Sequence, residues 1–414
     1  MGKHFSKIIK IIRDVLQNEA FKEQYRMQDK DFTRDRKLSF VEICTLIIRS
    51  TKNGLQAGIN EFLKETNTNI NGYSKAAYCK ARQKIHPDAF KALVGVTVQN
   101  FYKENRTKTM KGYRILAIDG SDLNLPNTES LLEVFGSEDF ANGIQVQAQV
   151  SCVYDVLNNV ILDGCIEPFN ANERTMAINQ LKALLPCKTE KDLILMDRGY
   201  PSEKLLQFLD DNGYFYLIRT NKNEFFREVR DVTGDDEIVK RECKDGSCLT
   251  MRVVSVPLPN GTTETLLTNL SENEFKHNDL AELYHFRWGI ETKYNDLKNK
   301  LTIEQFSGNT PICIYQDFYA TLFLSNLLAF LELDHQKELD KINSSPELKH
   351  AYKINTSLAI ATLKSNVTEL LIAPSKHKYN RVFKRIHVAL LQCLTPVRPG
   401  RSFPRRKKHP ALKY

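Results

Sequence analysis

The sequence has no hydrophobic run long enough to cross a membrane. Its most apolar stretch, residues 318–333, is interrupted by Ser325 and Asn326, whereas a membrane-spanning helix needs about 20 mainly apolar residues. The first residues also lack the pattern of a secretory signal peptide. We therefore expect no membrane insertion and no export.

A paired cysteine framework is also missing. The nine cysteines are odd in number and scattered over 414 residues, which argues against a disulfide scaffold and agrees with a reducing compartment. Cys243 and Cys248 lie close together, but no second pair is near them, so a zinc site is not expected. The sequence predicts a cytoplasmic protein.

Acidic residues are outnumbered by basic ones. The formal net charge is +9 and the pI is near 8.9, which favours an anionic partner, although many proteins with such an excess bind nothing acidic. Residues 401–414 hold six lysines and arginines and no acid. Such a block repels itself unless phosphates or solvent neutralise it.

Two short apolar runs each end in an aspartate. Asp119 follows Ile-Leu-Ala-Ile and Asp197 follows Leu-Ile-Leu-Met. Runs of this kind predict buried strands, and α/β sheets place their chemistry where strands emerge from the core. With Glu291 farther along, the layout is typical of a two-metal phosphoryl-transfer site.

Glu291 lies in a segment, residues 278–300, with the periodicity of one long helix. At about 100° per residue, one stripe of this helix carries polar side chains and a second stripe carries apolar ones. The polar stripe consists of Tyr284, Arg287, Glu291 and Lys298. These residues could face one site, but surface charges at favourable helical spacing would give the same pattern.

The pattern of helices and strands divides the chain into four regions. Residues 1–105 have helical periodicity and predict an N-terminal helical domain, whose helix at 74–84 places Lys80 and Lys84 on one face, either toward DNA phosphates or toward solvent. Residues 106–218 and 276–335 predict an α/β core that includes a buried helix at 318–333. Residues 219–275 predict a β-rich insertion, and residues 336–414 predict short helices followed by the basic tail.

Strict alternation marks one strand in the predicted core. Ile144, Val146, Ala148 and Val150 alternate with Gln145, Gln147, Gln149 and Ser151. Alternation with a period of two predicts a strand that buries one face and exposes the other.

The helical segment resembles a known family. The pattern Y-x2-R-x3-E-x6-K, formed by Tyr284, Arg287, Glu291 and Lys298, is similar to the signature of the insertion-sequence-four group of DDE transposases. The motifs Asp-Gly-Ser at 119–121 and Asp-Arg-Gly-Tyr at 197–200 resemble the two aspartate motifs of that group. The resemblance runs from about residue 38 to the tail, and includes residues 305–311 and 316–319.

This resemblance implies a fold and an activity. The fold would be a ribonuclease H-like catalytic core interrupted by the β-rich insertion, with the N-terminal helical domain binding DNA. The activity would be metal-dependent cut-and-paste transposition: binding of terminal inverted repeats, hydrolysis to a free 3′-OH, and strand transfer into target DNA. A DNA hairpin would be an intermediate, and a homodimer would hold the two ends.

The resemblance also implies roles for site residues. Asp119, Asp197 and Glu291 would be catalytic and would bind two Mg²⁺ or Mn²⁺ ions, cations that prefer oxygen ligands. Tyr284, Arg287 and Lys298 would contact DNA phosphates. Arg198 would either contact DNA or hold the Asp197 carboxylate.

One family feature lacks an obvious counterpart. Relatives stack an aromatic residue of the insertion on a flipped base, but the only tryptophan, Trp288, lies in the predicted glutamate helix. Phe225 and Phe226 are candidates by location alone, and packing in the core of the insertion is the favoured role for both.

Two other functions remain open. The chain could be a DNA-binding regulator that descends from a transposase and no longer cuts, although its complete acidic triad argues against this. It could also be a ribonuclease H-fold nuclease that cuts DNA and never joins it.

Overall fold

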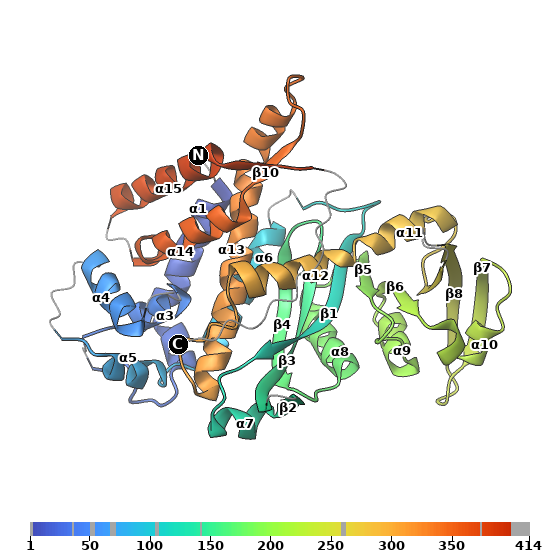
Figure 1. Ribbon diagram of the computed structural model, residues 1–414, viewed down its shortest axis with the longest axis horizontal. Helices are drawn as coiled ribbons and strands as arrows, with labels where there is room; N and C mark the ends of the chain where they lie inside the picture. Colours follow the sequence, from blue (N-terminus) through green and yellow to red (C-terminus); the bar gives the residue numbers. More distant parts are fainter. Residues whose placement is uncertain are drawn as a thin grey trace.

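A computed structural model describes residues 3–34, 37–49, 54–66, 72–103, 107–140, 143–257, 262–372 and 375–398. A large mixed sheet lies at one side of the molecule, and a group of helices lies beside it (Figure 1). The basic block at 401–414 lies outside the described residues.

The sheet has nine strands in the order β2-β3-β1-β5-β6-β9-β8-β7, with β4 also paired to β3. Strand β3 is antiparallel to both of its neighbours, β4 and β1, whereas β5 and β6 run parallel to β1. This arrangement is that of a ribonuclease H-like core and confirms the predicted fold class. The strands span Arg114–Asn124 (β1), Ser137–Phe140 (β2), Gly143–Asp155 (β3), Val160–Pro168 (β4), Asp192–Met196 (β5), Phe215–Thr220 (β6), Asp236–Glu242 (β7), Cys248–Pro257 (β8) and Thr263–Thr268 (β9).

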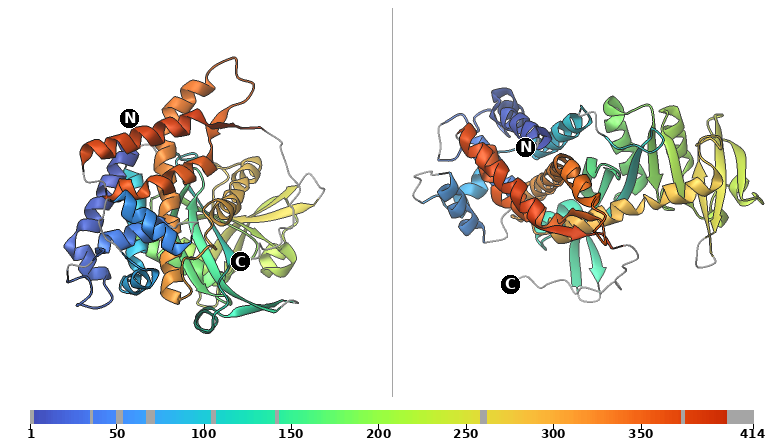
Figure 2. Two further views of the ribbon diagram at one scale, coloured as in Figure 1. Left: turned by 60° about the vertical axis from the view of Figure 1, so that its left-hand side comes forward. Right: turned by 90° about the horizontal axis from the view of Figure 1, so that it is seen from above.

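Strands of the predicted insertion continue the central sheet. β9 pairs antiparallel with β6, β8 pairs with β9, and β7 forms the edge. Both views in Figure 2 place these strands at the end of the molecule opposite the helical group. Residues 219–275 therefore lengthen the sheet that carries the aspartates.

The alternating strand differs from its prediction, because β3 is buried on both faces from Val146 onward, whereas Ile144 at its start is 56% exposed. Its polar side chains point toward hydrogen-bond partners and away from solvent. Ser151 Oγ donates to Gln180 Oε1 (2.7 Å), and Gln149 Nε2 donates to Glu173 Oε1 (2.7 Å). Both partners belong to α8 (Glu173–Leu184), so a helix covers the face that alternation predicts to be exposed.

Shorter helices connect the strands. Two of them begin at a polar cap: Ser202 accepts a hydrogen bond from the Leu205 amide at the start of α9, and Asn221 accepts one from the Asn223 amide at the start of η2. They span Glu129–Phe135 (α7), Leu185–Cys187 (η1), Glu203–Asp211 (α9), Lys222–Glu224 (η2) and Arg227–Arg230 (α10).

The prediction of a single helix at 278–300 is wrong in detail. The structure contains α11 (His277–His285), α12 (Trp288–Asn295) and a π-helical turn, η3 (Asp296–Lys300). Between α11 and α12 the amides of Phe286 and Arg287 bond to carbonyls three residues back, at 3.2 and 3.0 Å. This tighter turn interrupts the α-helical pattern, and it puts Arg287 at the joint between two nearly collinear helices (Figure 1).

The helical group combines segments from both ends of the chain. Its members are α1 (Lys3–Gln17), α2 (Glu19–Tyr25), α3 (Phe40–Arg49), α4 (Leu55–Glu65), α5 (Lys75–Arg82), α6 (Asp88–Lys103), α13 (Pro311–Asn343), α14 (Thr356–Ile372) and α15 (Lys376–Gln392). A small hairpin, β10 (Tyr352–Ile354) with β11 (Leu394–Pro396), joins its C-terminal part. The helices α14 and α15 have 17 residues each, so the short helices expected after residue 335 are longer than predicted.

The longest helix, α13, connects the helical group to the sheet. It extends well beyond the predicted 318–333 at both ends and packs on α6 and β4. Asn326, which interrupts the apolar run, accepts a hydrogen bond from the Ile161 amide and donates one to the Ile161 carbonyl, both at 2.8 Å. This side-chain amide therefore satisfies backbone groups of β4 that would otherwise be buried without partners.

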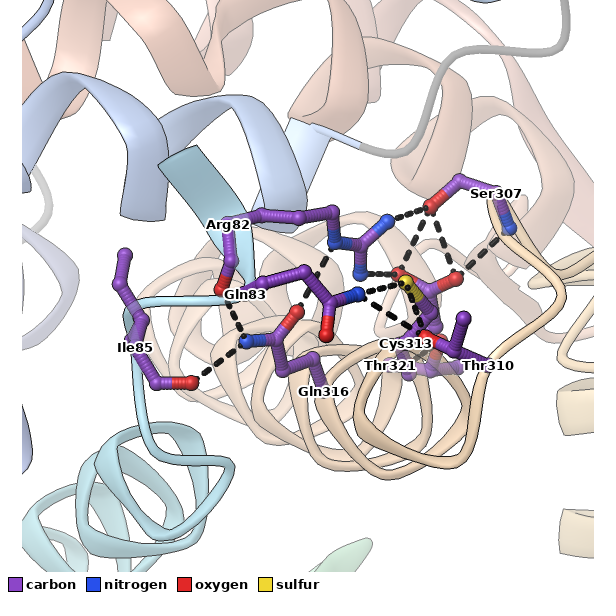
Figure 3. Close-up of polar contacts among 9 residues, drawn as sticks. Arg82, Gln83, Ile85, Ser307, Thr310, Cys313, Gln316 and Thr321 are labelled. Carbon is purple, nitrogen blue, oxygen red and sulfur yellow. Dashed lines mark hydrogen bonds and ion pairs between the residues drawn. The ribbon is translucent and has the colours of Figure 1, made fainter. Parts of the chain in front are cut away.

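A buried arginine joins the N-terminal helices to α13 (Figure 3). Arg82 donates to Gln316 Oε1 (2.9 Å), Ser307 Oγ (2.6 Å) and Asp317 Oδ1 (2.9 Å), and its exposed fraction is 1%. Gln316 in return donates to the carbonyls of Arg82 and Ile85. Two segments that resemble the family, 305–311 and 316–319, thus meet the end of α5 in one network.

The basic face expected at residues 74–84 is only partly present. The helix α5 ends at Arg82, so Lys84 lies beyond it and forms an ion pair with Asp31 (2.9 Å), whereas Lys80 is exposed. The domain boundaries and the DNA-binding role of residues 1–105 stay predictions. No helix in the described part of the chain has the length and apolar character to cross a membrane.

Candidate active site

The two predicted aspartates lie on adjacent parallel strands. β1 and β5 pair in a register that sets Ala117 opposite Leu195, and two residues farther along each strand come Asp119 and Asp197. Asp119 is inside the long β1, whereas Asp197 directly follows β5. The parallel register therefore places both carboxylates at the same edge of the core, as the apolar runs predict.

Each aspartate accepts a hydrogen bond from the amide of the next residue. The Gly120 amide donates to Asp119 Oδ1 (3.0 Å), and the Arg198 amide donates to Asp197 Oδ1 (2.7 Å). The Arg198 side chain is exposed. A guanidinium near Asp197 belongs instead to Arg219 of β6, whose Nη1 is 3.7 Å from Asp197 Oδ1.

Sequence reasoning missed Arg219. Its Nε also pairs with Glu264 Oε1 on β9 (3.0 Å), so it links Asp197 to the strand that lengthens the sheet. The sequence signal for this residue is its position, because Arg219 is a charged residue directly after the apolar run 214–218.

The third carboxylate approaches the aspartates through Arg287. Arg287 Nη2 donates to Glu291 Oε1 (2.7 Å), and Arg287 Nη1 is 3.7 Å from Asp119 Oδ2. Arg287 is only 3% exposed. Burial lowers the pKa of Arg287, but the hydrogen bond to Glu291 and the nearby negative charges outweigh this effect and raise it. The structure thus brings Glu291 and Asp119 close to two different nitrogen atoms of one buried guanidinium.

The electrostatics of Asp119 are clearly perturbed. Burial raises its pKa to about 6. The Gly120 amide and the Arg287 charge act in the opposite direction, while the charges of Glu173 and Asp197 add to the increase. Because these two nearby carboxylates disfavour ionisation of Asp119, a cation bound at this position would stabilise the charged form of Asp119.

Three side chains from the helices bond to backbone carbonyls beside the aspartates. Tyr284 donates to the Met196 carbonyl (3.3 Å), directly before Asp197. Tyr294 donates to the carbonyl of Asp119 itself (2.8 Å). Lys298 donates to the Asp122 carbonyl (2.6 Å). These contacts fasten α11, α12 and η3 to the ends of β1 and β5.

The predicted phosphate-binding residues therefore have partners within the protein. Tyr284 is 4% exposed and Arg287 is 3% exposed, while Lys298 lies partly open to solvent. Their phosphate contacts stay a prediction. The sequence pattern puts Tyr294 on the apolar stripe of the helix, so it does not predict that the Tyr294 hydroxyl bonds to the Asp119 carbonyl.

A fourth acidic residue, Glu173, lies beside the aspartate motif. It is the first residue of α8 and accepts a hydrogen bond from Gln149. Its position depends on Gly120: a Cβ atom there would collide with Glu173 Oε1 and lie 2.8 Å from Gln149 Nε2. The glycine of the Asp-Gly-Ser motif thus permits close approach of α8 to β1.

The candidate stacking residues pack against each other. The rings of Phe225 and Phe226 have centroids 4.0 Å apart, and the Arg241 guanidinium lies 4.0 Å from the Phe226 ring. Both phenylalanines are partly buried against the core. Trp288, by contrast, is 48% exposed and lies beside Arg287.

The donor set suits a hard divalent cation. Asp119, Asp197 and Glu291 offer carboxylate side chains that are 23%, 35% and 33% exposed, and Mg²⁺ and Mn²⁺ prefer such oxygens. Among the described residues, no three acidic, histidine or cysteine side chains already converge closely enough to hold a metal ion. Arg287, whose buried Nε has no hydrogen-bond partner within the described part of the chain, supplies positive charge between two of them.

A ribonuclease H-like sheet with two aspartates on adjacent strands and a glutamate on a following helix defines a class of proteins that process nucleic acids. Residues 110–327, more than half of the 414, match the family model described as the transposase DDE domain. The chain belongs to this family. Membership implies chemistry that depends on a divalent metal ion.

Two curated relatives come from Escherichia coli (strain K12). The chain is 22% identical over 270 residues to the transposase InsG for insertion sequence element IS4, covering 62% of this chain and 60% of that protein. It is 26% identical over 148 residues to the putative transposase InsZ, covering 35% of this chain and 48% of that protein. The matches thus span less than two thirds of either relative.

A solved structure is also similar at low level. It is the piggyBac transposase synaptic complex with hairpin DNA, at 11% identity and a TM-score of 0.47, covering 95% of this chain and 87% of that chain.

Proposed function

We propose that the chain is a DNA transposase that cuts and joins DNA through Asp119, Asp197 and Glu291. The observation that carries this proposal is the position of Arg287 between Asp119 and Glu291, beside the strand end that Asp197 follows, at one edge of a ribonuclease H-like core. A transposase DDE domain that includes all three residues supports it. The reaction comprises hydrolysis of a phosphodiester to a free 3′-OH and transfer of that end into target DNA.

The three carboxylates are the proposed ligands of two Mg²⁺ or Mn²⁺ ions. When bound, such ions would supply Lewis-acid activation of the attacking oxygen and stabilisation of the departing one. Asp119 and Asp197 hold their oxygens in fixed positions because the next amide in each chain segment bonds to them. Tyr294 and Tyr284 keep the strands and the glutamate helix in register at this edge.

Arg287 has two proposed tasks. In the protein alone it balances the charges of Asp119 and Glu291, and with DNA bound its planar fork contacts phosphate oxygens. Lys298 and Tyr284 are the other proposed phosphate contacts, of which Lys298 is the more accessible. None of the three transfers a proton in the reaction, because arginine stays protonated and water activation belongs to the cations.

Double-stranded DNA is the proposed partner, both as terminal inverted repeats and as target. We further propose a homodimer in the DNA complex, because two ends must be held together for coupled cutting and joining. The proposed place of action is the bacterial cytoplasm, on DNA of the nucleoid. The net charge of +9 agrees with a polyanionic partner.

The test is a cutting and joining assay with labelled DNA that carries the presumed element end, a target plasmid and Mg²⁺. The wild-type protein should cut at the end and join it to the plasmid, and EDTA or Asp119→Ala should abolish both. Asp211→Ala, at an exposed position at the end of α9, is the matched control and should retain both. Binding without cutting would favour the regulator, and cutting without joining would favour a nuclease.

A further inference from the structure

Glu173 is held close to the aspartate motif from the other side of β1. Gly120 leaves the space into which the Glu173 carboxylate fits, and Gln149 Nε2 donates to that carboxylate. The following residue, Arg174, donates from Nε to the Gly199 carbonyl (2.8 Å). The first turn of α8 is therefore fixed to both aspartate motifs, to Gly120 after Asp119 and to Gly199 after Asp197.

Glu173 and the aspartates are near enough for their charges to interact. The charge of Glu173 contributes to the raised pKa of Asp119, after the larger effect of burial. Burial and then the charge of Asp122 raise the pKa of Glu173 itself. In the described part of the chain, no ion pair of Glu173 with an arginine or lysine accompanies these repulsions.

A second and independent feature at the same place is the hydroxyl of Tyr200. Tyr200 is 1% exposed, and its hydroxyl has no hydrogen-bond partner among the described residues. Burial raises the pKa of Tyr200, and the charges of Glu173, Asp119, Cys165 and Asp197 add to the increase, in that order. A buried hydroxyl without a partner loses its hydrogen bonds to water on folding and gains none in return. A polar ligand bound among the carboxylates would give the Tyr200 hydroxyl a hydrogen-bond partner.

We propose that Glu173 and Tyr200 belong to the cation site: the Glu173 carboxylate is a further oxygen ligand beside Asp119, and the Tyr200 hydroxyl bonds to a water molecule of the bound ion. Mg²⁺ and Mn²⁺ take oxygen ligands, and Mg²⁺ usually keeps several waters that need partners. A hydroxyl that can both donate and accept suits such a water. This inference rests on the proposed function, because it concerns the cation that the reaction requires.

The test measures binding of Mn²⁺ alone, from the electron paramagnetic resonance signal of the free ion, and needs no DNA. Glu173→Gln keeps an acceptor for Gln149 but removes the negative charge. Tyr200→Phe removes only the hydroxyl. The matched control is Tyr216→Phe, because Tyr216 also has a buried hydroxyl without a partner among the described residues and is 0% exposed, but its neighbouring charge is Asp210.

Glu173→Gln and Tyr200→Phe should each weaken Mn²⁺ binding about tenfold or more, as losses around a metal site commonly do. Tyr216→Phe should bind like the wild-type protein. Without metal, both tyrosine variants should unfold at a higher temperature than the wild type, because each loses an unpaired buried hydroxyl. A purely structural role of Tyr200 would change the unfolding temperature and leave Mn²⁺ affinity unchanged.

The outcomes separate this inference from the proposed function. Wild-type affinity in both Glu173→Gln and Tyr200→Phe, with binding lost in Asp119→Asn, would overturn the inference and leave the proposed function standing. Absence of Mn²⁺ binding to the wild-type protein, or undiminished binding to Asp119→Asn, would overturn the proposed site itself. If Tyr200→Phe does not fold, Glu173→Gln alone decides the question.

Discussion

The three carboxylates of the site differ in how tightly the protein holds them. Asp119 is the least exposed, is bonded by the Gly120 amide and lies at one end of Arg287. Asp197 and Glu291 are more open and each has an arginine partner, Arg219 and Arg287. Burial therefore imposes a cost on the charge of Asp119 in the metal-free protein.

The raised pKa of Asp119 predicts that the stability of the folded protein depends on pH. Folded Asp119 has a pKa of about 6, against 3.8 for an ordinary aspartate, so the folded protein takes up this proton at higher pH than the unfolded chain. The contribution of Asp119 to the free energy of unfolding should increase as pH falls from above 6 toward 4, by at most about 3 kcal/mol. Urea unfolding of the metal-free wild type and of Asp119→Asn across this range measures the difference.

The variant itself provides the control for this titration. The Asp119→Asn side chain cannot ionise, so the stability of this variant should lack the increase expected as pH falls from about 6 toward 4. Parallel pH profiles of the two proteins would show that Asp119 titrates normally and that burial does not hold back its ionisation.

Among the helices, the joint between α11 and α12 positions Arg287 at the site. The sequence stripe of Tyr284, Arg287 and Glu291 correctly predicts side chains that approach one place. It could not predict the tight turn at residues 286–287, because hydrophobic periodicity averages over several turns and one altered hydrogen-bond step leaves the pattern intact. That turn places Arg287 between two helices, where it reaches both Glu291 and Asp119.

Arg287→Lys tests this placement. Lysine carries a point charge without a planar fork, so it cannot serve Glu291 and Asp119 together. We expect the metal-free protein to lose about 1–2 kcal/mol of stability, measured by urea unfolding, and cutting of DNA to decrease. Arg198→Lys, at an exposed position, should change stability by less than about 0.5 kcal/mol, and an equal loss in both variants would refute a special position for Arg287.

The strand β3 shows the same limit of sequence patterns. Alternation predicts the strand correctly, but it predicts neither the exposure of Ile144 nor the cover that α8 gives to the polar face. Gln149 and Ser151 look like solvent-facing residues until their partners Glu173 and Gln180 are placed opposite them. Polar partners that are distant in sequence leave no local periodicity, so the sequence pattern could not predict the contact between Gln149 and Glu173.

At the scale of the whole molecule, both ends of the chain combine in one helical group that α13 connects to the sheet. Arg82 is the buried contact between α5 and α13, and it is 234 residues from Gln316 and 235 from Asp317. From the residue pattern alone, the motif around Asp317 is no more than a family resemblance. Its physical role is to neutralise an arginine from the far end of the chain.

Arg82→Met should expose how strongly this contact joins the two parts. Methionine fills similar space but leaves Asp317 buried without its cation, and breaking a buried pair costs about 3–5 kcal/mol. Chemical unfolding should show this loss, while Lys80→Met on the exposed side of the same helix should change stability little. Equal midpoints for Arg82→Met and the wild type would show that the contact is dispensable.

Glu291, far from both aspartates in sequence, completes one acidic site with them in the proposed transposase. The decisive comparison is Mg²⁺-dependent cutting of a labelled element end by the wild-type protein, by Glu291→Gln and by Glu282→Gln, which alters an exposed glutamate of α11. Glu291→Gln should bind the end and fail to cut it, whereas Glu282→Gln should cut like the wild type. Cutting by Glu291→Gln at the wild-type rate would remove Glu291 from the site and refute the three-carboxylate assignment.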